Sequence, residues 1–172
     1  MMKQIPLTQG KFTLVDDEDF EWVNQWKWCA HTTDKNVFYA IRAIKSFDGK
    51  YIKLFLHREL LDLIKGDGKK VDHINHNGLD NRKCNIRVCT QLQNTYNRRP
   101  NKNCSSKFKG VSWHKGCNKW QSRIRIKGTI KHLGTFVKEI DAAIEYDSAA
   151  IKYFGEFSHI NFKDFSNENK QI

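Results

Sequence analysis

Hydrophobic and polar residues alternate over three short stretches in the first third of this chain, a pattern typical of β-strands that are buried on one side. The second and third stretches flank an Asp48-Gly49 pair, which favours a tight hairpin turn. Acidic residues at 16–19 favour the start of a short helix that runs through Asn24, because they complement the helix dipole. The pattern predicts a small mixed β region over residues 1–56, with strands at residues 11–15, 37–43 and 51–56.

Three tryptophans lie within this β region, at Trp22, Trp26 and Trp28. They could stack on nucleic-acid bases, but large aromatic side chains more often fill a hydrophobic core. We therefore expect all three in the core. A short helix is expected next, over residues 57–64, closed by Lys65-Gly66.

The last third of the chain alternates again and then becomes helical. Strands are predicted at residues 108–113, 119–126 and 129–136, and a helix at about 139–154. In the middle strand, Trp120 and Ile124 point to one side, whereas Arg123, Arg125 and Lys127 point to the other. Small residues at helical spacing let the helix lie close against the apolar face of a thin sheet. The cationic face then remains open, as in a sheet that enters a DNA major groove.

Residues 71–94 combine groups that are suited to hydrolysis. They predict a strand, a glycine-containing loop, a second strand and a helix that Thr90 caps. Asp72 and Asn94 both offer oxygen ligands, which suit a hard cation such as Mg²⁺. A neutral His73 beside that cation can take a proton from an attacking water near pH 7. One metal ion, one base and nearby positive charge together indicate phosphodiester hydrolysis.

Positive charge is concentrated in the middle of the chain. The net charge is +11, yet residues 1–80 hold twelve basic and twelve acidic residues, whereas residues 81–138 hold fifteen basic residues and no acidic one. A segment of this length without a carboxylate is typical of a protein that binds a polyanion. No basic amphipathic helix is evident, so membrane phospholipid is disfavoured and nucleic acid is the expected partner. Charge alone does not discriminate DNA from RNA.

The remaining composition excludes several classes of protein. No apolar run approaches the ~20 residues that span a membrane, and no signal-peptide core is present, so we expect a cytoplasmic protein. Five cysteines without a regular framework disfavour disulfides in that compartment. Cys84 and Cys89 leave a structural Zn²⁺ site open as an alternative.

Over residues 56–97, the spacing of Asp72-His73, Asn85 and Asn94 resembles that of the HNH endonucleases, in the branch where Asn replaces the final His. The resemblance implies a ββα-metal core in which His73 is the general base. It further implies that Asp72 and Asn94 hold one divalent cation per site, Mg²⁺ or Mn²⁺. Asn85 would join the two strands and orient His73.

Two further histidines lie near these residues. His57 belongs to a Leu-His-Arg segment similar to one that precedes the core of many HNH chains, and we expect it to pack or to contact phosphate. His76 follows His73 by three residues and could compete as the base. Its place in an Asn-His-Asn-Gly loop favours a loop or phosphate contact instead.

Residues 107–162 resemble the Apetala-two type of DNA-binding domain of plant ethylene-response transcription factors. The matching residues include Phe108-Lys-Gly-Val111, Lys119-Trp120, Arg123-Ile-Arg125, Leu133-Gly-Thr-Phe136 and Ile160-Asn-Phe162. The resemblance implies that six residues contact DNA: Lys109, Ser112, His114, Arg123, Arg125 and His132. We add Lys127, which is expected on the same face of the strand as Arg123 and Arg125. The plant pattern has other residues at four of these positions, so its sequence preference is not expected here.

These features predict an α+β protein in which a small β region and a ββα-metal core precede a three-stranded antiparallel sheet packed on one helix. The expected parts are 1–56 (β region), 57–99 (HNH core), 100–107 (linker), 108–162 (DNA-binding domain) and 163–172 (tail). The expected function is metal-dependent cleavage of double-stranded DNA, by nicking or double-strand cutting, at a specific site as in homing endonucleases of phages and mobile elements. The alternative is a non-catalytic, sequence-specific DNA-binding regulator.

Overall fold

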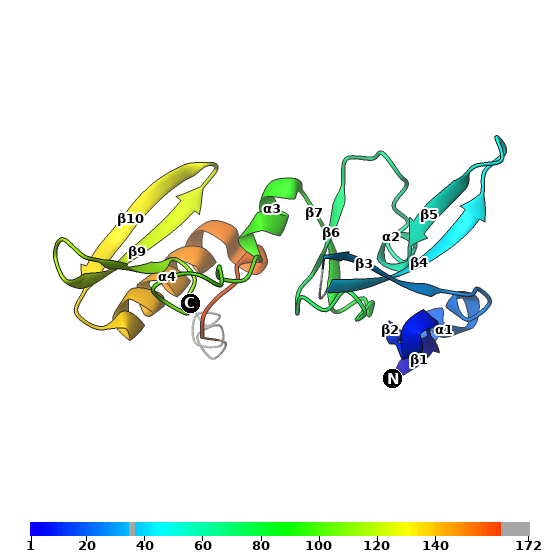
Figure 1. The fold of residues 1–172 in the computed structure, drawn as a ribbon, viewed down its shortest axis with the longest axis horizontal. Coiled ribbons are helices and arrows are strands. Elements are labelled where there is room, and N and C mark those ends of the chain that lie inside the picture. Colours follow the sequence, from blue (N-terminus) through cyan, green and yellow to red (C-terminus); the bar gives the residue numbers. More distant parts are fainter. Residues whose placement is uncertain (35–36, 163–172) are drawn as a thin grey trace. The chain divides into compact units, whose positions relative to one another are not determined.

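The structure is a computed structural model that describes residues 1–34 and 37–162, so the tail expected at 163–172 lies outside the described residues. The chain divides into two compact units, one over residues 1–91 and one that begins at Leu92 (Figure 1). The described residues form four small antiparallel sheets and four α-helices, which confirms the expected α+β class. None of the described helices is long and apolar enough to cross a bilayer.

The first unit contains a hairpin, a three-stranded sheet, a second hairpin and two short helices. In chain order these are β1 (Met2–Pro6), β2 (Phe12–Asp16), α1 (Asp17–Val23), β3 (Cys29–Asp34), β4 (Val37–Lys45), β5 (Tyr51–Phe55), α2 (Leu56–Glu59), β6 (Lys70–His73) and β7 (Ile86–Cys89). β1 pairs with β2, β4 lies between β3 and β5, and β6 pairs with β7. The expected strands and the expected α1 are confirmed, and β1 and β3 were not foreseen.

One hydrophobic core joins these elements. Its fully buried members come from different elements and include Ile5, Val15, Val23 and Leu56. Main-chain hydrogen bonds also connect β2 to the segment between β6 and β7, because the Leu14 amide donates to the Leu79 carbonyl (2.8 Å) and the Leu14 carbonyl accepts from the Asn81 amide (2.9 Å). β1 and β2 therefore support the β6–β7 hairpin directly.

The tryptophans of the first unit have different environments. Trp28 is buried, and Trp22 packs against the core as a half-buried side chain. The expectation that Trp26 lies in the core is wrong, because its side chain is 48% exposed. The Arg42 guanidinium lies 4.2 Å from the centre of its ring, a distance typical of a cation–π contact.

The helix expected over residues 57–64 is much shorter than the sequence indicated. α2 ends at Glu59, and Asp62 adopts a left-handed conformation with φ of 51°, which a continuing helix does not allow. Arg58 then holds the following loop by donating to the carbonyls of Ile64 (2.6 Å) and Lys69 (2.9 Å). The residues after α2 therefore form a loop that is fixed to the helix by one guanidinium.

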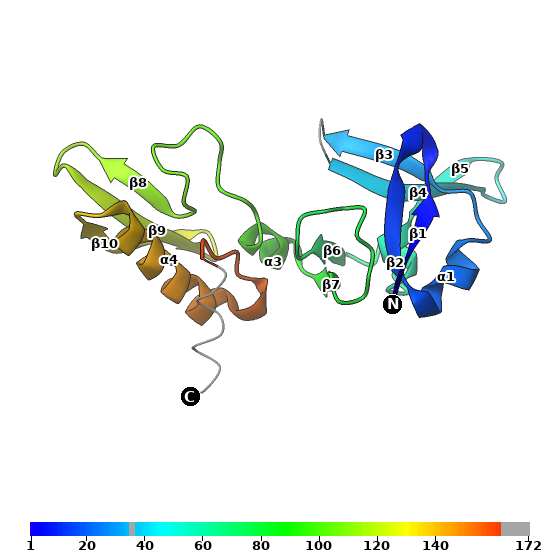
Figure 2. The ribbon, with the colours of Figure 1, turned by 90° about the horizontal axis from the view of Figure 1, so that it is seen from below.

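In the second unit, one long helix packs on a three-stranded sheet. Its elements are α3 (Gln91–Tyr96, with Gln91 counted in the first unit), β8 (Val111–His114), β9 (Lys119–Ile126), β10 (Thr129–Phe136) and α4 (Glu139–Phe154). β9 lies between β8 and β10, and α4 runs along one face of this sheet (Figure 2). The expected alternation is confirmed, because Ser122 and Ile124 are buried against α4 while Arg123 and Arg125 are exposed.

The close approach of α4 to the sheet depends on small residues. Ala142, Ala143 and Ala150 are completely buried. On the other side of the contact, Gly110 has φ of 78°, and a β-carbon at this position would lie 1.9 Å from a ring carbon of Tyr146. Glycine is therefore required at position 110 both by backbone conformation and by packing.

Candidate active site

The β6–β7 hairpin positions the acid and the base side by side in the chain. Asp72 lies opposite Arg87 in the ladder, and its Oδ2 accepts from the Arg87 Nε (3.0 Å) and Nη2 (2.7 Å). His73, the last residue of β6, lies opposite Ile86. Both Asp72 and His73 are buried, so their side chains are held by protein contacts rather than by solvent.

A chain of hydrogen bonds fixes the His73 ring. The Thr13 hydroxyl donates its single proton to the Leu79 carbonyl (2.8 Å), so it must accept from the Asn81 side chain, whose Nδ2 lies 2.7 Å away. The Asn81 Oδ1 therefore faces His73, and it lies 3.2 Å from the ring Nε2. Because an amide oxygen only accepts, Nε2 carries a proton and the lone pair of the neutral ring lies on Nδ1.

The surroundings of His73 favour its neutral form. Its ring packs against Tyr39 and, at right angles, against His57, with ring centres 5.8 and 5.1 Å away. Burial lowers the pKa of His73 below its ordinary value of 6.5, partly offset by the Asn81 hydrogen bond and by the charges of Asp72 and Asp80. Burial also lowers the pKa of His57 to about 3. Both rings are therefore neutral near pH 7, the state that a general base needs.

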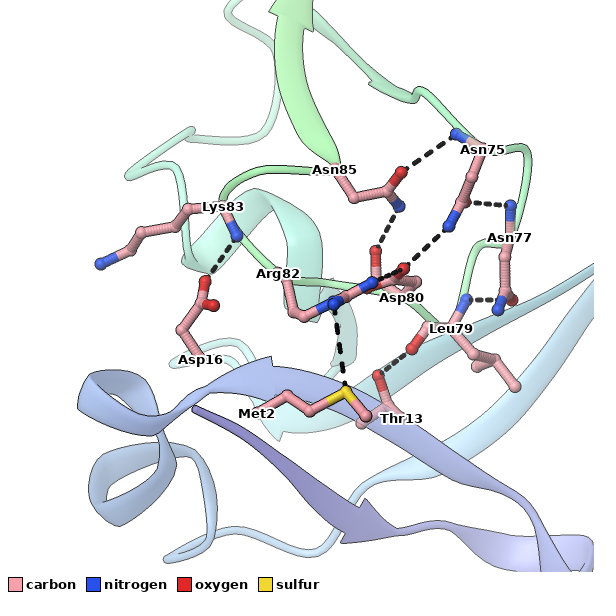
Figure 3. Close-up of polar contacts among 10 residues, drawn as sticks. All are labelled: Met2, Thr13, Asp16, Asn75, Asn77, Leu79, Asp80, Arg82, Lys83 and Asn85. Carbon is pink, nitrogen blue, oxygen red and sulfur yellow. Dashed lines mark hydrogen bonds and ion pairs between the residues drawn. The ribbon is translucent and has the colours of Figure 1, made fainter. Parts of the chain in front are cut away.

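Asn85 has a structural position in the loop between β6 and β7. Its Oδ1 accepts from the Asn75 amide (3.0 Å) and its Nδ2 donates to the Asp80 carbonyl (2.8 Å), so it joins the two ends of the loop (Figure 3). Asp80 is almost fully buried and accepts from the Arg82 guanidinium and from the Asn75 side chain. The His73 Nε2 proton is donated to the Asn81 Oδ1, so Asn81 is a further side chain that orients the base.

Asn94 lies in α3, one turn after Thr90, and its side chain is half-buried. It belongs to the second unit, whereas Asp72 belongs to the first. The chemistry of this pair fits a hard divalent cation, because a carboxylate and an amide oxygen are both ligands that Mg²⁺ accepts together with water. Among the described residues, no three His, Cys, Asp or Glu side chains gather as a potential metal site.

The cysteines give no support to the structural zinc alternative. Cys84 is exposed, Cys89 is buried, and the described residues do not complete a ligand set around them. Burial raises the pKa of the Cys89 thiol to about 11, so this thiol is protonated near pH 7.

The residues expected to contact DNA lie mostly on the open face of the β8–β9–β10 sheet. His114, Arg123, Arg125 and His132 are exposed there, and Lys127 is exposed in the turn between β9 and β10, with φ of 46°. Ser112 is half-buried and accepts from the Arg123 Nη2 (3.1 Å). Lys109 differs from these residues, because its ammonium group donates to the Tyr96 carbonyl and its burial lowers its pKa to about 8.

Three residues that support the base and the acid were not predicted from the sequence: Asn81 contacts His73, Arg87 contacts Asp72, and Thr13 contacts Asn81. Thr13 and Asn81 are distant from each other in the chain, and a signal for either was absent. Arg87 is different, because in a hairpin the residue opposite Asp72 follows from the register, and an opposite-charge pair across a ladder is a common stabilising contact.

Comparison with known proteins agrees with both resemblances. A protein of Acanthamoeba polyphaga mimivirus, named an uncharacterized HNH endonuclease, is 31% identical over 162 residues, which are 91% of this chain and 78% of that protein. No family model and no solved structure matches the chain. At this identity and coverage, the chain belongs to the HNH endonuclease family.

The Apetala-two part is supported by plant proteins. APETALA2-like protein 2 of Oryza sativa is 42% identical over 64 residues, and an AP2-like ethylene-responsive transcription factor of Arabidopsis thaliana is 42% identical over 59 residues. These matches cover 36% and 33% of this chain but only 14% and 17% of the plant proteins. The chain therefore combines an HNH part with an AP2-like part.

Proposed function

We propose that this protein is a metal-dependent DNA endonuclease that hydrolyses phosphodiester bonds. The observation that carries the proposal is the environment of His73: a neutral, buried imidazole beside Asp72 whose Nε2 proton is held by Asn81. The name of the mimivirus relative supports the same activity.

In this proposal the His73 Nδ1 takes a proton from water, the resulting hydroxide attacks the phosphorus of the scissile phosphodiester, and the bond from phosphorus to the leaving sugar oxygen breaks. Asp72 and Asn94 would hold a single Mg²⁺ or Mn²⁺ ion, which would stabilise negative charge on the phosphate. Asn85 keeps the loop between β6 and β7 closed and so holds His73 at the end of its strand. His57 and Tyr39 pack beside the base and exclude water from its buried side.

The second unit provides the DNA-binding surface in this proposal. Arg123 and Arg125 contact base edges, while the other exposed cations of the sheet contact phosphates and make binding sensitive to salt. Double-stranded DNA is the expected substrate, and the domain bounds are those given by the two resemblances. One nuclease centre per chain is consistent with nicking. The proposed role is homing-like cleavage at a defined site inside a bacterial or virus-infected cell, and the relative named as an HNH endonuclease is also a viral protein.

A non-catalytic DNA-binding regulator is the second candidate. Two observations favour it: the plant relatives are named as transcription factors, and the Asp72 carboxylate is already engaged by Arg87. In this reading the HNH part contributes its fold and not a reaction.

A plasmid assay separates the two candidates. Purified full-length protein is incubated at low salt with supercoiled plasmid and long genomic DNA, in Mg²⁺, in Mn²⁺ and in chelator. We expect metal-dependent nicks, and we expect His73→Ala to reduce the rate at least ~10²-fold while binding is almost unchanged, because only the base is removed.

His76→Ala is the matched control and should retain activity. Cleavage that survives in His73→Ala contradicts the proposed base, and DNA that is bound but never cut favours the regulator.

A further inference from the structure

A hollow with a basic lining lies beside the candidate active site in the first unit. It has a volume of about 610 Å³ and is bounded by β5, by α2 and by the loop that leads into β6. We call it the basic hollow, and its charged lining residues are Lys53, Arg58, Glu59, Lys65, Asp67, Lys69 and Lys70. Its wall also includes His57 and Tyr39, which both pack on the ring of His73. The hollow is therefore separated from the candidate base by these two rings.

The two acids of the basic hollow are already paired. Glu59 accepts from the Arg42 guanidinium, which lies outside the lining, with its closest contact at 3.0 Å. Asp67 accepts from Arg58 at 2.9 Å and also from the Lys69 amide. Negative charge in the hollow is thus compensated within the protein.

The four lysines of the basic hollow are compensated less: Lys69 lies near enough to Asp67 to interact with its charge, but Arg58 already binds that carboxylate. Lys53, Lys65, Lys69 and Lys70 are exposed, and no carboxylate of the described residues forms an ion pair with any of them. Residues 1–80 carry as many acids as bases, but five of the twelve acids lie at residues 16–21, outside the hollow. An electrically balanced segment therefore presents a locally positive surface next to its active site.

The loop that carries Lys65 and Lys69 has a fixed shape. Arg58 donates to the carbonyls of Ile64 and Lys69 and to the Asp67 carboxylate, so one guanidinium ties the loop to α2 at three points. Gly66 and Gly68 adopt positive φ angles of 94° and 72°, which let the loop turn sharply between these anchors. Cations on a preorganised loop lose less entropy on binding than cations on a free one.

We propose that the basic hollow holds the sugar–phosphate backbone of DNA next to the scissile bond. This role rests on the proposed function, which makes DNA the substrate. A DNA duplex carries a high density of negative charge at regular spacing along its backbone, which suits four lysines along one groove. Contacts to backbone phosphates position DNA without reading its sequence. The hollow is a second contact with DNA, separate from the exposed sheet of the AP2-like part.

The test removes two of the four lysines and compares an equal change elsewhere in the same unit. Full-length protein, Lys65→Gln/Lys69→Gln and the control Lys27→Gln/Lys45→Gln are titrated against a labelled random-sequence duplex in chelator, over a range of KCl concentrations. The control lysines are exposed and lie outside the hollow. We expect the slope of log K against log[KCl] to fall by about 2 in the hollow variant only, since each phosphate contact contributes about one unit.

Plasmid cleavage in Mg²⁺ by the same three proteins provides the second readout. The hollow variant should lose kcat/KM with little change in kcat, because the base is intact. A wild-type slope in the hollow variant, or an equal loss in the control, overturns the proposal even if the protein cuts DNA. A selective loss of slope with no cleavage by any protein supports the DNA contact and contradicts the proposed nuclease function.

Discussion

At the scale of single residues, the environment of His73 depends on a side chain from a distant strand. Thr13 lies on β2, and its hydroxyl determines the orientation of the Asn81 amide and hence the tautomer of His73. The sequence predicted His73 as the base and Asp72 beside it, because the two are adjacent and their chemistry is recognisable. The sequence could not predict the role of Thr13, because nothing in the local pattern of this strand marks that residue and only the fold brings it to Asn81.

This arrangement predicts the effect of Asn81→Ala. The change removes the acceptor of the His73 Nε2 proton and the donor to the Thr13 hydroxyl, so we expect a loss of stability of about 1–3 kcal/mol and a mixture of His73 tautomers. The ¹⁵N chemical shifts of the two ring nitrogens of His73 report the tautomer directly. Thr13→Ser is the matched control, because it keeps the hydroxyl and should keep a single tautomer. An unchanged tautomer in Asn81→Ala would show that other contacts fix the ring.

At the scale of elements, periodicity predicted the second unit better than the first. Strong alternation and an alanine-rich helix define β9 and α4, and the residues expected on each face lie there. In the first unit, β1 contributes one buried side chain, Ile5, and so carries no clear alternation. α2 is short because Asp62 is left-handed and Arg58 bonds to loop carbonyls, contacts that a helical pattern does not encode.

The packing of α4 on its sheet gives a prediction at this scale. Gly110→Ala introduces a methyl group that meets the buried Tyr146 ring and adds strain at a positive φ, so we expect it to destabilise the second unit by at least about 2 kcal/mol. Gly128→Ala is the matched control: its φ is also positive, at 89°, but no atom lies within 4 Å of the added carbon. Thermal unfolding should therefore separate the two variants, and equal melting temperatures would refute the packing argument.

At the scale of the whole molecule, the two units have different proposed roles: the first carries the hydrolytic site and the second recognises DNA. The acid-free segment of the sequence runs from the β6–β7 hairpin through the sheet of the second unit. The basic hollow lies outside that segment, within residues 53–70, so a charge count along the chain did not find it. Local charge depends on which acids are paired within the protein, as Glu59 and Asp67 are.

The division of work predicts a separable defect in Arg125→Ala. Arg125 is exposed on the open face of the sheet, and we expect its loss to weaken site-specific binding by about 1–3 kcal/mol while the nicking rate at saturating DNA is unchanged. Lys131→Ala removes the same charge from the other side of the sheet, where its ammonium group donates to the Tyr153 hydroxyl (2.7 Å). Its affinity should be close to wild type. Equal binding by Arg125→Ala and wild type at the selected site would contradict the assigned face.

The sequence by itself determined the α+β class, the strands and helix of the second unit, and the residues whose chemistry indicates a nuclease. These properties are local, because periodicity, charge and short spacings are written along the chain. Only the tertiary structure decided that Asn81 holds His73, that Arg87 pairs with Asp72, that Trp26 is exposed and that four lysines gather around a hollow. These properties depend on which side chains the fold brings together: Thr13, for example, holds Asn81 across 68 positions of the chain, and the packing of the core selects such contacts.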